Sequence, residues 1–295
     1  TAVIEMAQAS GLTLVPPNKM NPLVTTSYGT GELIKYGLDL GCTRFIVGLG
    51  GSATNDGGLG MGQALGFSFL DQEGKPLGFG GGELVRLAKI ETGGADLRLS
   101  QADFEVAADV QNVLTGPTGA SYVYGPQKGG TPAQLELLDG ALENYGRILK
   151  RDLGRDVAAK PGAGAAGGLG AGLMALLNAE IRSGIELILD LFDFSQKARG
   201  AQLVLTGEGR LDAQSAYGKV PLGVGRRCRA LGVPAVALAG TVLQEAEILH
   251  QEGISAYFSI CGGPLSLEQA INSGAELLEN QAAQVLRLFL AAAGN

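Results

Sequence analysis

Apolar runs of two lengths recur along the chain, and their order predicts an α/β protein. Residues 44–47 (RFIV) form a short apolar run that is typical of a buried strand, and residues 104–109 (FEVAAD) form another. Residues 30–40 and 132–152 carry the wider apolar spacing of helices. Glycine-rich polar segments lie between these elements, so we expect strands to run through loops into helices.

Two further segments of the first half have weaker patterns. Residues 2–9 (AVIEMAQA) are expected to form a short helix, and residues 67–82 a hairpin that turns at Glu73–Gly74. Three prolines between residues 12 and 22 predict a loop.

From residue 198 onwards the pattern becomes regular. AQLVLTGEG, VPAVALAG and AYFSICGG read as strands, and helix-like stretches follow each of them. This β-α-β-α-β-α order at short intervals is the signature of a doubly wound parallel sheet. We therefore expect an α/β domain with glycine-rich loops over residues 1–197 and a Rossmann- or flavodoxin-like domain over residues 198–295.

Composition and charge narrow the classes of function. Glycine contributes 48 of 295 residues, about 16% against a typical ~7%, and the glycines gather where strands are expected to end. The net charge of -7 disfavours a nucleic-acid partner, which needs clustered Lys and Arg. We see no membrane span and no signal peptide, and we expect a cytoplasmic protein that acts on a small molecule. A homo-oligomer remains open.

The residues of classical metal and acid–base sites are scarce. His250 is the only histidine, and it lies near the end of a helix-like stretch before Gly253, where a solvated structural role is expected. The three cysteines, Cys42, Cys228 and Cys261, are far apart and lack metal-ligand spacing. Carboxylates are thus the default acids and bases.

The first candidate site is the loop that follows residues 44–47. Its sequence, GLGGSATNDGG, combines glycines, which let backbone N–H groups approach an anion, with hydroxyl and amide side chains. The alternative is a tight turn with an Asn-Asp helix cap. We expect a ligand-binding loop whose ligand contacts come from Gly50, Gly51, Ser52, Thr54 and Asn55, and in which Asp56 could bind Mg²⁺.

Two more segments of the first half carry candidate groups. Asp109 ends a strand and Asn112 follows it, so this pair could bind a metal or accept a hydroxyl proton. Lys128 could hold a carboxylate or phosphate, although a solvated surface lysine is an equal alternative. The segment PGAGAAGGLG at residues 161–170 could offer amides to an anion or could let a helix pack closely.

The fourth segment, TGEGRLD followed by QSAYGK, combines acids and cations. Acids beside cations suit phosphoryl transfer, which needs Mg²⁺ coordination and charge neutralisation. A surface ion-pair network is the alternative. We expect Glu208 and Asp212 to face Mg²⁺, and Arg210 or Lys219, together with Lys128, to contact ATP phosphates or a substrate carboxylate.

At these segments the sequence resembles the bacterial type-1 glycerate kinases. The matching stretches are GGSATNDGG, DVQNVLTGPTGASYVYGPQKGG, PGAGAAGGLGAGL, TGEGRLDAQSAYGKVPLGV and NPLVTTSYGTGELI. The resemblance implies ATP- and Mg²⁺-dependent phosphorylation of D-glycerate, with 2-phosphoglycerate favoured over 3-phosphoglycerate, in an active site between two domains. Asp109 then becomes the candidate base or substrate-hydroxyl ligand, with Asp212 and Lys128 as its catalytic partners.

The sequence departs from the family pattern in two places. The run Asp109-Val110-Gln111-Asn112-Val113-Leu114 stands where family members often have Asp-Val-Thr-Asn-Pro-Leu. The family's Asp-Ser-aromatic-Lys and Asp-Gly-Gly-Glu-Gly-Thr motifs do not occur in this sequence. We expect that these motifs belong to an N-terminal segment that would complete the Rossmann-like domain.

Two other functions fit the same loops. A nicotinamide-dependent oxidoreductase would use an acid about 20 residues beyond a GxGxxG loop, and Asp71 is roughly so placed. A non-catalytic metabolite-binding protein would need only the glycine loops.

Overall fold

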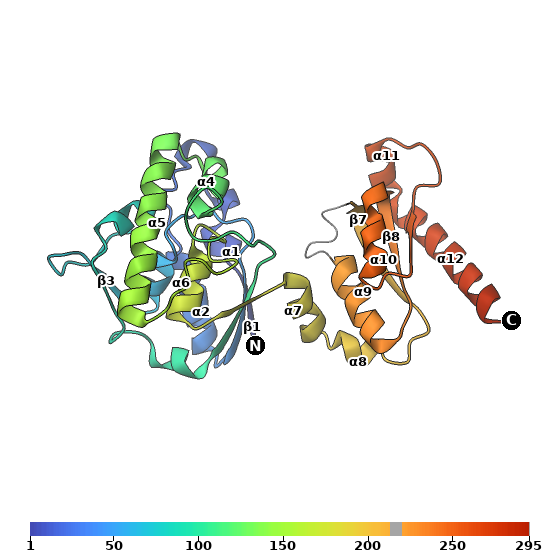
Figure 1. Cartoon of the computed structure of the whole chain (residues 1–295), viewed down its shortest axis with the longest axis horizontal. Coiled ribbons are helices and arrows are strands. Elements are labelled where there is room, and N and C mark those ends of the chain that lie inside the picture. Colours follow the sequence, from blue (N-terminus) through green and yellow to red (C-terminus); the bar gives the residue numbers. More distant parts are fainter. Residues whose placement is uncertain (213–219, 295) are drawn as a thin grey trace. The chain divides into compact units, whose positions relative to one another are not determined.

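The computed structural model describes residues 1–212 and 220–294, which form two compact units (Figure 1). Unit 1 is Thr1–Arg182 and unit 2 is Ser183–Asn295. The division falls earlier than the boundary expected near Ala198. Helices α7 (Gly184–Leu191) and α8 (Phe194–Ala198) belong to unit 2 because they pack against its helix α9 (Val220–Leu231), where Arg227 binds the carboxylates of Glu186 and Asp190 on α7.

A parallel sheet forms the centre of unit 1. Its strands are β1 (Ala2–Glu5), β2 (Arg44–Gly48), β5 (Asp103–Ala107) and β6 (Glu180–Arg182), in the order β1-β2-β5-β6. The expectation of a helix from residue 2 was wrong, because residues 2–5 pair along β2 and only the following residues are helical. The register places the last residues of the four strands side by side at one edge of the sheet.

The helices of unit 1 pack around this sheet and against one another. They are α1 (Ala7–Ser10), α2 (Tyr28–Asp39), α3 (Leu59–Ala64), α4 (Ala120–Tyr124), α5 (Pro132–Leu153) and α6 (Leu169–Leu176). Among them, α2 contacts β1, and α6 contacts β5 and β6. Helix α5 starts with a capping box between Thr131 and Gln134 and stops at Gly154, whose φ of 67° ends the helix. In the core, Phe45 of β2 stacks on Phe104 of β5 at 4.9 Å between ring centroids.

The expected hairpin of residues 67–82 forms at its turn and over the residues beside it, because the Leu77 amide donates to the Phe69 carbonyl oxygen at 2.9 Å and Leu70 forms an antiparallel bridge with Pro76. The Asp71 amide donates to the carbonyl oxygen of Lys75 at 2.9 Å, so the turn is present. Strand β3 (Ser68–Leu70), however, pairs along its whole length with β4 (Lys89–Glu91), farther along the chain.

Unit 2 confirms the predicted alternation of strands and helices. Strands β7 (Val204–Leu211), β8 (Ala235–Val242) and β9 (Ala256–Ser259) form a parallel sheet in that order. Its remaining helices are α10 (Ile248–Gln251), α11 (Leu267–Asn272) and α12 (Gly274–Ala293). The two parallel sheets confirm the α/β fold class. In the described part of the chain, no helix has both the length and the apolar character needed to cross a membrane.

Candidate functional site

The carboxyl edge of the sheet in unit 1 carries the loops that the sequence analysis singled out. Gly48, the last residue of β2, lies beside Ala107, the last residue of β5. The glycine loop, defined here as Leu49–Gly58, follows β2, and residues 108–119 follow β5. Ligands of open α/β sheets bind at this edge. The two loops therefore start from neighbouring strands at the edge where a ligand is expected.

The exposed part of the glycine loop is Gly50–Gly51. Within the described part of the chain, the amide groups of these residues donate to no acceptor. The loop is nevertheless fixed, because the Gly51 carbonyl oxygen accepts from the Leu12 amide at 2.8 Å. Gly51 has a φ of 72°, and a Cβ on Gly50 would meet no atom within 4 Å. Two open backbone donors on a fixed, exposed turn suit an anionic group.

The polar side chains of the glycine loop face inward, contrary to expectation. Ser52, Thr54 and Asn55 are buried. The Asn55 side-chain amide donates to the Ser121 hydroxyl at 2.9 Å, and Ser52 forms a backbone bridge with Gly11. The Asn55 amide nitrogen and the Ser52 backbone hold the loop against unit 1, whereas the Thr54 hydroxyl and the Asn55 oxygen are buried without a hydrogen-bond partner among the described residues. None of the three side chains is open to a ligand from solvent.

Asp56 is fully buried, and its surroundings do not fit the expected role of Mg²⁺ ligand. Its oxygens accept from the amide and hydroxyl of Ser27 at 2.8 and 2.9 Å, and from the amides of Gly58 and Gly60 at 3.2 Å each. Three of these donors bind Oδ2 and one binds Oδ1, and neither oxygen is open to solvent, whereas Mg²⁺ in proteins usually keeps several water ligands. Asp56 therefore ties the start of α2 to the start of α3.

Lys128 is also buried, with 1% of its surface exposed. Its Nζ donates to the carbonyl oxygen of Thr54 at 2.7 Å. Burial lowers the pKa of Lys128 to about 8, and the negative charge of Asp56 opposes this shift. A side chain that points into the protein does not meet a phosphate from solvent, so the expected direct contact does not fit.

Two further buried residues near Asp56 were not identified from the sequence. Tyr145 of α5 is fully buried, and burial, together with the charge of Asp56, raises the pKa of its hydroxyl. Ser27 bonds Asp56, and its oxygen also accepts from the Met61 amide at 3.0 Å. The only sequence signal for Ser27 is the run of hydroxyl residues before α2; Tyr145 reads as an ordinary core residue of an amphipathic helix.

Asp109 is exposed and lies two residues beyond the end of β5. Asn112 follows it, but its amide is occupied within the loop. Its nitrogen donates to the Thr118 carbonyl oxygen at 2.8 Å, and its oxygen accepts from the Tyr124 hydroxyl at 2.6 Å. Of the predicted pair, Asp109 is thus the group on the surface, and Asn112 shapes the loop that follows it.

The glycines of residues 161–170 serve close packing. A Cβ on Gly167 would lie 2.0 Å from the carbonyl oxygen of Thr54, and the Gly167 carbonyl oxygen accepts from the Gly57 amide at 3.0 Å. The Gly164 amide donates to the Asn112 carbonyl oxygen at 2.9 Å. This segment therefore brings the two loops together, and residues 162–170 are buried. Of the two readings, close packing is the one that fits.

The acids and cations of unit 2 differ in position from the prediction. Glu208 and Arg210 lie inside strand β7, which extends to Leu211, and not in a loop after it. The Arg210 Nε lies 3.3 Å from a carboxylate oxygen of Asp212, the residue that follows the strand. Lys219 lies outside the described residues.

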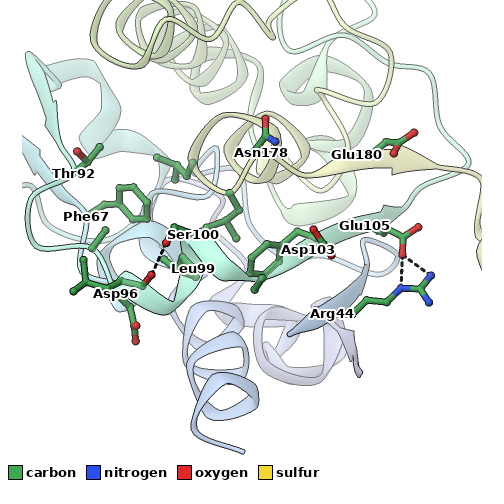
Figure 2. Close-up of a pocket in the computed structure, with 16 residues that line it drawn as sticks. Arg44, Phe67, Thr92, Asp96, Leu99, Ser100, Asp103, Glu105, Asn178 and Glu180 are labelled. Atoms are coloured by element: carbon green, nitrogen blue, oxygen red, sulfur yellow. Dashed lines mark hydrogen bonds and ion pairs between the residues drawn. The ribbon is translucent and has the colours of Figure 1, made fainter. Parts of the chain in front are cut away.

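A cavity of about 790 Å³ lies at the opposite edge of the sheet in unit 1 (Figure 2). Arg44, Asp103 and Glu180 line it, and each is the first residue of its strand. Figure 2 shows Arg44 joined to Glu105, at 2.7 Å. Within the described residues, no group of three or more His, Cys, Asp or Glu side chains could hold a metal ion. This cavity is separate from the glycine loop, which starts at the other end of β2.

Comparison with known proteins gives a consistent result. The model of the Glycerate kinase family matches residues 1–290. The chain is 49% identical to a glycerate kinase of Haemophilus influenzae over 289 residues, which cover 98% of this chain and 76% of that protein. It is 49% identical to the glycerate 2-kinase of Escherichia coli over 270 residues, covering 92% and 71%. The crystal structure of a glycerate kinase 2 from Salmonella typhimurium LT2 superposes with a TM-score of 0.88 at 45% identity, covering 99% of this chain and 76% of that one.

Proposed function

This chain belongs to the glycerate kinase family, and from that premise we propose that it transfers the γ-phosphoryl group of ATP to D-glycerate, with Mg²⁺, and that the product is 2-phosphoglycerate. The protein is a kinase of a small organic acid. As an enzyme that consumes ATP, it is proposed to act in the cytoplasm.

The observation that carries the proposed site is the open turn at Gly50–Gly51. Both ligands of a glycerate kinase carry anionic oxygens, as phosphates in ATP and as a carboxylate in glycerate. The amides of Gly50 and Gly51 lie on the carboxyl edge of the sheet without acceptors in the described part of the chain. Backbone donors that are fixed before the ligand arrives stabilise negative charge without reorganisation. We assign these amides to one of the two anionic groups.

Asp109 is proposed as the group that binds the reacting hydroxyl and accepts its proton. It is exposed and follows β5, the strand beside β2, so it starts from the same edge as the glycine loop. His250 does not suit this role. Its Nδ1 lies 2.9 Å from the Ile254 carbonyl oxygen, and its ring stacks on Tyr257 with 5.0 Å between centroids.

Mg²⁺, when bound, neutralises phosphate charge and orients the transferring group. It usually takes one or two carboxylates and completes its shell with phosphates and water. Glu208 and Asp212 fit this requirement better than Asp56. One oxygen of Glu208 accepts from the Gly209 amide at 3.0 Å, and both residues are partly exposed. Arg210, and Lys219 beyond the described residues, stay proposed as phosphate-binding cations.

The oxidoreductase alternative has little support in the geometry of Asp71. That reading needs Asp71 to accept a ribose hydroxyl. One oxygen of Asp71 accepts instead from the amides of Glu73 and Lys75 at 3.0 and 2.9 Å, and these bonds, with the positive charge of Arg86, lower its pKa. Asp71 therefore stabilises a turn.

A coupled assay of ADP formation tests the proposal. The purified protein with ATP, Mg²⁺ and D-glycerate should form ADP, and ³¹P NMR of the product should show 2-phosphoglycerate. Lactate keeps the C2 hydroxyl of glycerate and has none at C3. ADP formation with lactate would therefore support phosphorylation at C2. Binding of D-glycerate without ADP formation would support a non-catalytic protein, and 3-phosphoglycerate as the product would overturn the proposed regiochemistry.

A further inference from the structure

The side chain of Lys128 enters the protein from a rigid turn. Lys128 ends the short 3₁₀ helix Pro126–Lys128, and its amide donates to the Gly125 carbonyl oxygen at 3.1 Å. The next residue, Gly129, has a φ of 86°, and a Cβ there would lie 2.8 Å from Met20. The turn therefore aims the lysine inward, toward the glycine loop.

A buried ammonium group is costly unless it has partners. The partner of Lys128 is the Thr54 carbonyl oxygen, 2.7 Å away, and Asp56 supplies the opposite charge two residues later. In the described part of the chain, that carbonyl oxygen accepts from no other donor. Gly167 packs so closely against it that a single methyl group would clash. The lysine thus donates a hydrogen bond to a buried carbonyl group against which Gly167 also packs.

We propose that Lys128 is a positioning residue of the glycine loop: its Nζ fixes Thr54, and through Thr54 the turn at Gly50–Gly51, without contacting the ligand. The inference rests on the proposed role of that turn as the anion site. Lys128 and Asp56 act on two sides of Asn55. Lys128 holds the carbonyl group before Asn55, while Ser27, Gly58 and Gly60 hold the carboxylate after it.

This role differs from a direct phosphate contact in what it predicts for the ligand-free protein. The amides of Ala53 and Gly57 are hydrogen-bonded to the carbonyl oxygens of Ser10 and Gly167, at 2.9 and 3.0 Å. These two amides report how firmly the loop is held. Removal of the Lys128 bond should expose them to exchange before any ligand is added.

Hydrogen–deuterium exchange of ligand-free Lys128→Met is the test, with Lys150→Met as the matched control. Lys150 is an exposed lysine on α5 that pairs with Asp156 on the surface. We expect the amides of Ala53 and Gly57 to exchange at least tenfold faster in Lys128→Met and to be unchanged in Lys150→Met, with unit 2 unaffected in both. Wild-type exchange at the two amides, whether or not ligand affinity falls, would overturn the proposal.

A second measurement on the wild-type protein covers the case that Lys128→Met does not fold. The side-chain signal of Lys128, labelled with ¹³C at Cε, is titrated with and without saturating Mg²⁺-ATP or D-glycerate. We expect the proton concentration at the titration midpoint to change by less than threefold when either ligand is added. A tenfold or larger shift toward alkaline pH with either ligand would show an anion at the ammonium and would overturn the proposal. Neither readout depends on turnover, so failure of this inference is distinct from failure of the kinase assignment.

Discussion

The hydroxyl of Ser27 donates to the carboxylate of Asp56 at 2.9 Å, and both residues are fully buried. The same Ser27 oxygen accepts from the Met61 amide at 3.0 Å. Ser27, the residue before α2, thus binds both Asp56 of the glycine loop and the first turn of α3. This buried link explains why Asp56 is a structural residue.

Replacement of Asp56 by Asn should lower the free energy of unfolding by about 3–5 kcal/mol. Asn cannot accept from all four donors, and the buried Lys128 would lose its opposite charge. Urea denaturation without Mg²⁺ measures the effect. The control is Asp39→Asn, which removes an exposed ion pair with Arg98 and should cost no more than about 1 kcal/mol. Wild-type stability of Asp56→Asn, with an altered Mg²⁺ requirement, would restore the metal role.

Replacement of Gly167 by Ala should be far more destabilising than the same change at Gly154. The two glycines have nearly equal φ values, 66° and 67°, so the cost of the left-handed backbone, about 1 kcal/mol, is shared. Only Gly167 has a neighbour, the Thr54 carbonyl oxygen, in the way of a Cβ. Thermal unfolding of the two variants separates the backbone cost from the clash. Equal melting temperatures would contradict the close packing of the two loops.

The titration of Lys128 should make stability rise with pH in the alkaline range. The folded protein lowers the pKa of Lys128 from 10.5 to about 8, so between these values the unfolded chain binds more protons. Stability therefore increases as pH rises from about 8 to 10.5, by up to about 3 kcal/mol. The difference in unfolding free energy between wild type and Lys128→Met isolates this contribution from Tyr145 and other groups. A difference that stays constant from pH 7.5 to 10.5 would contradict the lowered pKa.

Replacement of Asp109 by Asn should lower kcat by roughly 10²-fold or more, because the amide cannot accept the hydroxyl proton. Its exposed position implies little loss of stability. Asp103→Asn is the matched control, since Asp103 is an exposed acid at the other end of the same strand. Steady-state kinetics of both variants decide the matter. A kcat within threefold of wild type in Asp109→Asn would remove it as the base.

The sequence predicted the elements around the site better than the direction of its side chains. Residues 44–47 and the glycines after them predicted strand β2, the glycine loop and helix α3 correctly. A buried apolar run and a glycine turn are local signals. Burial of Thr54 and Lys128 has no local signal. Thr54 is covered by Gly167, which is more than a hundred residues away in the sequence, and the Lys128 Nζ binds the Thr54 carbonyl oxygen from another distant segment.

The predicted boundaries of two strands were wrong for a similar reason. Residues 2–5 become a strand only because β2 offers them a partner, and TGEGRL continues β7 because β8 pairs with it as far as Leu211. Glycine and charged residues in that run favour a loop by local preference alone. Long-range pairing overrides this preference, which moved Glu208 and Arg210 from the predicted loop into a strand.

The binding of ATP and D-glycerate to Gly50→Val tests the central claim most directly. A Cβ on Gly50 meets no atom of the protein within 4 Å and φ is not positive there, so the substitution should leave the fold intact. Gly93→Val is the matched control, because Gly93 is also exposed, with open space and no positive φ.

If the amides at Gly50–Gly51 hold an anionic group, isothermal titration should show at least tenfold weaker binding of ATP or D-glycerate to Gly50→Val, about 1.4 kcal/mol, and unchanged binding to Gly93→Val. Wild-type affinity of folded Gly50→Val for both ligands would contradict the account.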